Sequence, residues 1–127
     1  MLRFKPMMAV ATVLVAGAAM FVLPAVTEAG RLGGPLVVEG VAGADDYDVY
    51  TARFEGGKQA KIGVVNTGKC DLDLIILDPK TLKVVAQDTK AAADAHVKFT
   101  PPSTREYVII VHNYTKNKSC KYVMFTN

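Results

Sequence analysis

With 127 residues the chain is long enough for one domain that can bury a real, though small, core. Its 15 basic and 12 acidic residues give a formal net charge of only +3, which speaks against a nucleic-acid-binding protein. Two of the basic residues, Arg3 and Lys5, lie at the N-terminus, so the rest of the chain is closer still to neutral.

The first 29 residues have the three-part layout of a secretory signal peptide. A basic start, Met1–Lys5, precedes the apolar residues 7–26, and Thr27-Glu28-Ala29 offers a small-x-small cleavage site. An uncleaved membrane anchor is the alternative, because the apolar run is long for a signal. We expect a signal-peptide helix over 1–29, a flexible lead-in over 30–35, and a secreted or periplasmic domain over 36–127.

From residue 36 onward, apolar runs of strand length alternate with turn residues, which is typical of an all-β sandwich. The most apolar run, Leu72–Leu77, ends in an Asp-Pro turn and predicts a strand buried on both faces in the middle of the sandwich. We expect strands over 36–40, 47–55, 59–66, 72–77, 82–87, 96–100, 107–114 and 121–126.

Period-two alternation predicts which side chains face inward. The inward sets are Tyr50, Ala52 and Phe54; Ala60, Ile62 and Val64; Val97 and Phe99; Tyr107, Ile109 and Val111; and Tyr122 and Met124.

The two cysteines, Cys70 and Cys120, are predicted to form one disulfide, as is usual in an exported protein. If every strand crosses the sandwich once, the connections that contain them fall at the same end, so a bond is geometrically allowed. The alternative, a reactive or metal-binding thiol pair, has no CxxC spacing and no nearby histidine to support it.

Several segments resemble the bacterial pre-peptidase C-terminal domain. Asp46–Tyr50 followed by Phe54-Glu55-Gly56-Gly57 is similar to the family's acidic, aromatic-rich strand that runs into a glycine turn. The likeness continues through residues 60–64, 71–78, 97–102, 107–111 and 120–122. One departure is Arg105-Glu106 before Tyr107, where the family usually has a glycine.

The resemblance implies a jelly-roll-like β-sandwich without catalytic activity. Members of this family are usually appended to secreted peptidases and other exported enzymes, and some resemble calcium-dependent modules that bind collagen or polysaccharide. No catalytic domain accompanies this domain in the 127 residues, so the peptidase-associated role is not carried over.

Acidic residues from several loops are predicted at the same end as the cysteines. Carboxylates from separate loops can supply the six to eight oxygens that calcium needs, and Asp45, Asp46, Asp71 and Asp73 are the candidates. The alternative, which we favour, is that they are solvated turn residues. No other cofactor is expected.

His96 and His112 lie in no catalytic motif and are predicted to point outward as surface histidines.

Tyr114, Lys116 and Lys118, in the loop before the last strand, are candidates for binding a polysaccharide or a protein. The alternative is a soluble loop whose lysines discourage edge pairing. Asn113-Tyr114-Thr115 and Asn117-Lys118-Ser119 also fit the N-glycosylation pattern.

Together these features predict a non-catalytic binding or accessory module whose ligand is a polymer or another exported protein. A small secreted enzyme or inhibitor with an unfamiliar site and a structural component of the cell envelope are the alternatives. A membrane partner is expected only if the signal is not cleaved.

Overall fold

The computed structural model describes residues 4–6 and 30–127, and the regular elements of this part of the chain are nine strands. They are β1 (Phe4–Pro6), β2 (Leu36–Ala42), β3 (Tyr47–Phe54), β4 (Ala60–Asn66), β5 (Leu72–Leu77), β6 (Val84–Asp88), β7 (Ala95–Phe99), β8 (Arg105–Asn113) and β9 (Cys120–Thr126). No helix of the described residues is long and apolar enough to cross a membrane.

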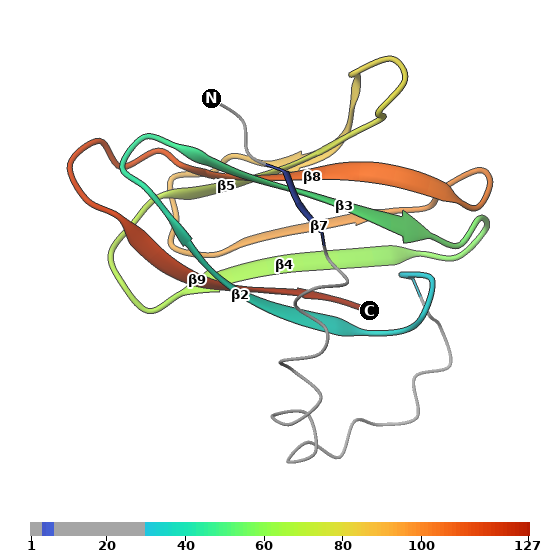
Figure 1. Ribbon diagram of the computed structural model, residues 1–127, viewed down its shortest axis with the longest axis horizontal. Coiled ribbons are helices and arrows are strands. Elements are labelled where there is room, and N and C mark those ends of the chain that lie inside the picture. Colours follow the sequence, from blue (N-terminus) through green and yellow to red (C-terminus); the bar gives the residue numbers. More distant parts are fainter. Residues whose placement is uncertain (1–3, 7–29) are drawn as a thin grey trace, which may run out of the picture.

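The strands form two sheets, with the orders β1-β3-β8-β5-β6 and β2-β9-β4-β7. Figure 1 shows the sheets stacked, with β3, β8 and β5 above β4, β9 and β2. Successive strands from β2 onward alternate between the sheets, except that β5 and β6 form a hairpin within one sheet. This antiparallel arrangement of eight strands in two sheets is a jelly roll. The predicted all-β sandwich is therefore confirmed.

The main core lies between the two sheets and is built from the inward sets that alternation predicted. It includes Tyr50, Phe54, Ile62, Ile109 and Met124, each with at most 1% of its surface exposed. All members of this cluster lie between residues 36 and 124. Residues 30–127 therefore supply all of the core that the structure describes.

The most deeply buried strand is β8, whereas the sequence had pointed to β5. In β5, Leu72, Leu74 and Ile76 are fully buried, but the residues between them are only half-buried. In β8, every residue from Tyr107 to Asn113 is buried. The reason is position: β8 lies between β3 and β5 in its sheet, whereas β5 is next to the edge strand β6.

The strand expected over 82–87 begins at Val84, because residues 78–82 form a tighter turn than expected. The Asp78 carboxylate accepts a hydrogen bond from the Lys80 amide at 2.8 Å, and the Asp78 carbonyl accepts one from the Leu82 amide at 2.8 Å. Leu82 has a φ of 58°, which is outside the range of a strand. The chain can therefore become extended only after Leu82.

The predicted signal-peptide helix lies outside the described residues, apart from Phe4–Pro6. These three residues form the short strand β1, blue in Figure 1, which pairs in parallel with β3. The division at residue 29 stays a prediction.

Candidate functional site

Four loops meet at one end of the sandwich, on the left in Figure 1: residues 43–46, 67–71, 89–94 and 114–119. Cys70 and Cys120 are joined there by a disulfide, with a Cα–Cα separation of 6.3 Å. This confirms the predicted bond and shows that both cysteines lie at the same end. We call this end of the molecule the disulfide end.

Hydrogen bonds between backbones hold these loops together. The Asp45 amide donates to the Thr115 carbonyl at 2.9 Å, and the Tyr114 amide donates to the Asp71 carbonyl at 2.8 Å. The Asp71 amide in turn donates to the Thr115 hydroxyl at 3.0 Å. The loop before β9 is therefore tied to two other loops, which fixes the direction of the side chains that it carries.

Asn113 organises the same loop from inside the protein. Its side chain is fully buried, and its amide nitrogen donates to the carbonyl oxygens of Ala42, Gly43 and Lys118 at 2.8–3.3 Å. Its amide oxygen accepts a hydrogen bond from the Thr115 amide at 3.0 Å. The sequence had marked Asn113 only as a glycosylation pattern, and burial of its amide group rules out that role in the folded protein.

His112 is the centre of a side-chain cluster on the outer surface of the disulfide end. The strand register places Tyr47, His112 and Asp73 side by side on β3, β8 and β5. The Tyr47 ring stacks on the imidazole with 4.3 Å between the ring centroids, and the Tyr114 ring meets it edge-on at 5.6 Å. Asp45 completes what we call the His112 cluster.

Two carboxylates hold the imidazole from opposite sides. The His112 Nε2 atom lies 3.3 Å from Asp45 Oδ1, and its Nδ1 atom lies 3.5 Å from Asp73 Oδ2. Only 8% of His112 is exposed, against 36% of Tyr47 and 56% of Tyr114. The prediction of a surface histidine is therefore wrong for His112: its ring points outward, but neighbours from four other segments, β3, β5 and the loops that carry Asp45 and Tyr114, surround it. His96 is exposed, as predicted.

Partial burial and the nearby Asp71 carboxylate raise the pKa of Asp73, although His112 acts in the opposite direction. Because the pKa of Asp73 is higher in the folded than in the unfolded protein, its protonated form favours folding at pH values below the ordinary pKa of about 4. This contribution to stability is lost as the pH rises and the carboxyl group ionises. We therefore expect Asp73→Asn to become more favourable relative to wild type as the pH rises above about 4. Urea unfolding at several pH values measures this, and a change in the opposite direction would contradict it.

The structure brings the four calcium candidates to one end but gives them separate contacts. Asp45 and Asp73 face His112, while the Asp46 carboxylate accepts a hydrogen bond from the Tyr47 amide at 2.8 Å. The Asp71 Oδ1 atom is buried without a hydrogen-bond partner. Within residues 30–127, no group of three or more His, Cys, Asp or Glu side chains is placed to hold a metal ion. Calcium binding at these residues stays a proposal.

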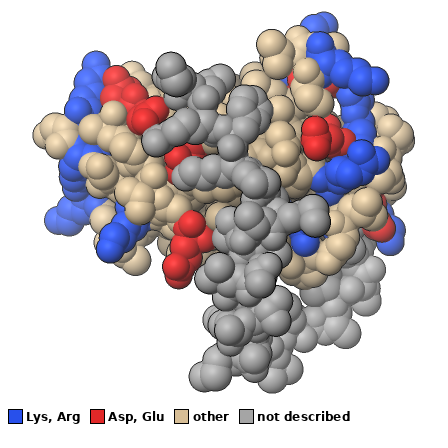
Figure 2. Space-filling model, viewed as in Figure 1, with Lys and Arg blue, Asp and Glu red and all other residues tan. Residues whose placement is uncertain are grey.

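Of the three predicted ligand-binding residues, Tyr114 joins the His112 cluster, whereas Lys116 and Lys118 are exposed on the loop beyond it. Figure 2 shows basic and acidic side chains close together at this end of the molecule. The end therefore combines two partly exposed aromatic rings with charges of both signs.

A second cluster of polar side chains lies inside the sandwich, where only packed apolar and aromatic side chains were expected. The Tyr122 hydroxyl donates to Asp48 at 2.6 Å and lies 2.5 Å from the Tyr50 hydroxyl, and all three residues are buried. Burial raises the pKa of Tyr50 to about 12 and also raises the pKa of Tyr122, so both phenols stay protonated at neutral pH. The sequence contained a signal for this buried carboxylate: Asp48 is two residues before the inward-facing Tyr50, so period-two alternation points Asp48 inward as well.

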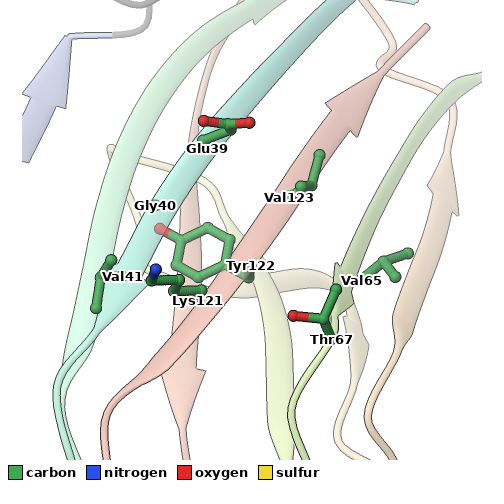
Figure 3. A pocket seen from close by; sticks show the side chains of 8 residues that line it. All are labelled: Glu39, Gly40, Val41, Val65, Thr67, Lys121, Tyr122 and Val123. Carbon is green, nitrogen blue, oxygen red and sulfur yellow. The ribbon is translucent and has the colours of Figure 1, made fainter.

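A shallow hollow of about 460 Å³ lies on the outer face of the other sheet. Figure 3 shows Glu39 and Val41 on one side of it, Val65 and Thr67 on the other, and Tyr122 behind Gly40. Three of its eight lining residues are valines, and it has one acidic and one basic side chain, Glu39 and Lys121. The hollow has no pair of partly exposed aromatic rings grouped around a buried side chain, as the His112 cluster has, so that cluster is the stronger candidate site.

Comparison with family models finds no match, and no curated protein matches the sequence. Solved structures do match. The pre-peptidase C-terminal domain of a Bacillus anthracis collagenase is similar with a TM-score of 0.63 and 22% identity, over 79% of this chain and 95% of that domain.

Two other similar structures come from different kinds of protein. PliG of Aeromonas hydrophila, a periplasmic inhibitor of g-type lysozyme, has a TM-score of 0.56 and 11% identity over 99% of this chain and 96% of its own. The mitogen of Yersinia pseudotuberculosis has a TM-score of 0.57 and 11% identity over 74% and 85%. At these identities the likeness establishes the fold alone. In its fold, the chain resembles the pre-peptidase C-terminal domain.

Proposed function

We propose that the chain is an exported, non-catalytic binding module, and that another exported protein binds to it at the His112 cluster. The observation that carries this proposal is the pair of partly exposed tyrosines, Tyr47 and Tyr114, held against the buried His112. Tyrosine supplies a large contact area and is enriched where protein interfaces are strongest.

The rigidity of the site supports the same proposal. The disulfide and the hydrogen bonds of Asn113 fix the loop that carries Tyr114 before any partner arrives. A surface that is already ordered loses little conformational entropy on binding. The likeness in fold to PliG, whose own partner is a lysozyme, is in keeping with a protein partner, and an exported location agrees with the predicted signal peptide.

A polysaccharide is the second candidate, because exposed Lys116 and Lys118 lie on the same loop as Tyr114 and would attract an acidic polymer. The two candidates differ in the residues on which they depend. A protein partner needs the aromatic rings, whereas an acidic polymer depends mainly on the two lysines and on low salt.

Tyr114→Ala is expected to weaken partner binding at least about 10-fold, as loss of a central aromatic contact usually does. The measurement is surface plasmon resonance of residues 30–127 against exported proteins, a g-type lysozyme among them, and against polysaccharide and collagen arrays. Leu82→Ala is the matched control, since Leu82 is 68% exposed in the loop between β5 and β6, away from the His112 cluster. Binding of polysaccharide alone, lost without the two lysines but kept in Tyr114→Ala, would contradict a protein partner.

A further inference from the structure

A second apolar cluster lies on the outer face of the sheet that contains β3, β8 and β5. It consists of buried Val49, Val108 and Ile110, with half-buried Ile75 and Leu77 packed against them. The register arranges these side chains in two rows across the strands: Val49, Ile110 and Ile75 in one, and Thr51, Val108 and Leu77 in the other. We call these two rows the outer band.

The composition of the outer band is that of a covered surface. An antiparallel sheet with one solvated face alternates apolar and polar residues along each strand. In β8 the two outward-facing residues of the band, Val108 and Ile110, are instead apolar, and both are buried, as is Val49 opposite Ile110. Exposing such a band to water costs about 25 cal/mol for each Å² of apolar surface, so it favours a partner that covers it.

The described residues show what kind of segment fits beside the band. Strand β1 pairs in parallel with the edge of β3, with Phe4 opposite Val49 and Pro6 opposite Thr51. These are the two β3 residues of the outer band. Without β1, β3 is the edge strand of its sheet, and an uncovered edge is a template for another strand.

The outer band is also continuous with the His112 cluster. The row next to Val49 and Ile110 consists of Tyr47, His112 and Asp73. A segment that runs parallel to β3 therefore begins beside the His112 cluster and continues along the band. One extended partner segment can contact both surfaces.

We propose that the β3 edge and the outer band form a docking surface for an extended segment of a partner protein. The segment adds to β3 as a parallel strand, its backbone bonds to the β3 edge, and its alternate apolar side chains extend the two rows of the band beyond Val49 and Thr51. In the full-length protein β1 pairs with this edge, and removal of β1 with the predicted signal peptide leaves the edge free for a partner strand. This inference rests on the proposed function and adds to it the type of partner: a protein with an extended apolar segment.

The test uses residues 30–127 and a labelled synthetic peptide of residues 1–10 as the probe. We expect saturable binding by fluorescence anisotropy, slower hydrogen exchange of β3 amides when the peptide is bound, and binding at least 10-fold weaker for Thr51→Lys. Thr51 is partly exposed, so this variant is expected to fold. The matched control Val37→Asp, on the outer face of the other sheet where Val37 is 39% exposed, should bind as wild type does.

Absence of saturable binding, or equal binding by Thr51→Lys and wild type, would overturn the inference. So would a dimer of residues 30–127 in sedimentation equilibrium that the peptide does not dissociate, because a second copy would then cover the band. Tyr114→Ala separates this inference from the proposed function. If that variant binds the peptide normally and also keeps full affinity for the partner, the role of the His112 cluster fails while the docking surface stands.

Discussion

Replacing Cys70 and Cys120 together by alanine is expected to lower the free energy of unfolding by about 4 kcal/mol. The bond joins residues that are 50 positions apart, and closing a loop of this length removes much of the conformational freedom of the unfolded chain. Domains of this size have only about 5–15 kcal/mol of net stability, so the loss is a large share of the total.

The loss should also act locally. The disulfide joins the loop before β5 to the first residue of β9, and the loop that carries Tyr114 runs between β8 and β9. Without the bond, hydrogen exchange in residues 67–71 and 114–119 should become faster than in the strands of the core.

Urea unfolding of the double variant and of wild type, each with and without reductant, measures the effect. Wild type with reductant should approach the double variant, and the midpoint of thermal unfolding should fall by roughly 20 °C. Reductant should leave the stability of the double variant unchanged, so this variant is the control for effects of reductant that do not involve the disulfide. Equal stability of the variant and oxidised wild type would show that the unfolded chain is restricted by something other than the bond.

Much of the fold follows from local patterns in the sequence. A continuous apolar run identified β5 with its bounds, and alternation between apolar and polar residues placed the inward side chains of five strands. The count of strand crossings put both cysteines at one end. These features depend on which residues are neighbours along the chain, and the 98 residues after the predicted signal are rich in strand and turn signals.

Features that depend on neighbours from other strands were not predictable in the same way. His112 was correctly placed on the outer face of its strand, but its burial comes from Tyr47 on β3, Asp73 on β5 and the loop that carries Asp45. Those contacts require the register of three strands, which the sequence does not state. The same holds for the outer band, which becomes visible only when Val49, Ile110 and Ile75 are seen to form one row.

Gly40→Ala is expected to destabilise the protein by about 3 kcal/mol, because the added methyl group would push the Tyr122 ring away from its buried hydrogen-bond partners. Gly40 pairs with Tyr122, and a Cβ atom at Gly40 would lie 2.4 Å from the Cζ and Oη atoms of the tyrosine ring. The ring has little room to move: it is 98% buried, and its hydroxyl is held by Asp48 and Tyr50. A displaced ring would lose both of these contacts.

A double-mutant cycle with Tyr122→Leu tests this cause directly. Leucine removes the atoms that the new methyl group meets, so Gly40→Ala should cost less than about 1 kcal/mol in that background, and the coupling between the two changes should be about 2 kcal/mol. Gly43→Ala is the matched control, since its Cβ would lie 3.5 Å from the nearest atoms, those of Asp46, and should change stability by less than about 0.5 kcal/mol. An equal cost of Gly40→Ala in both backgrounds would mean that the backbone of β2, and not the room left for the Tyr122 ring, requires glycine at this position.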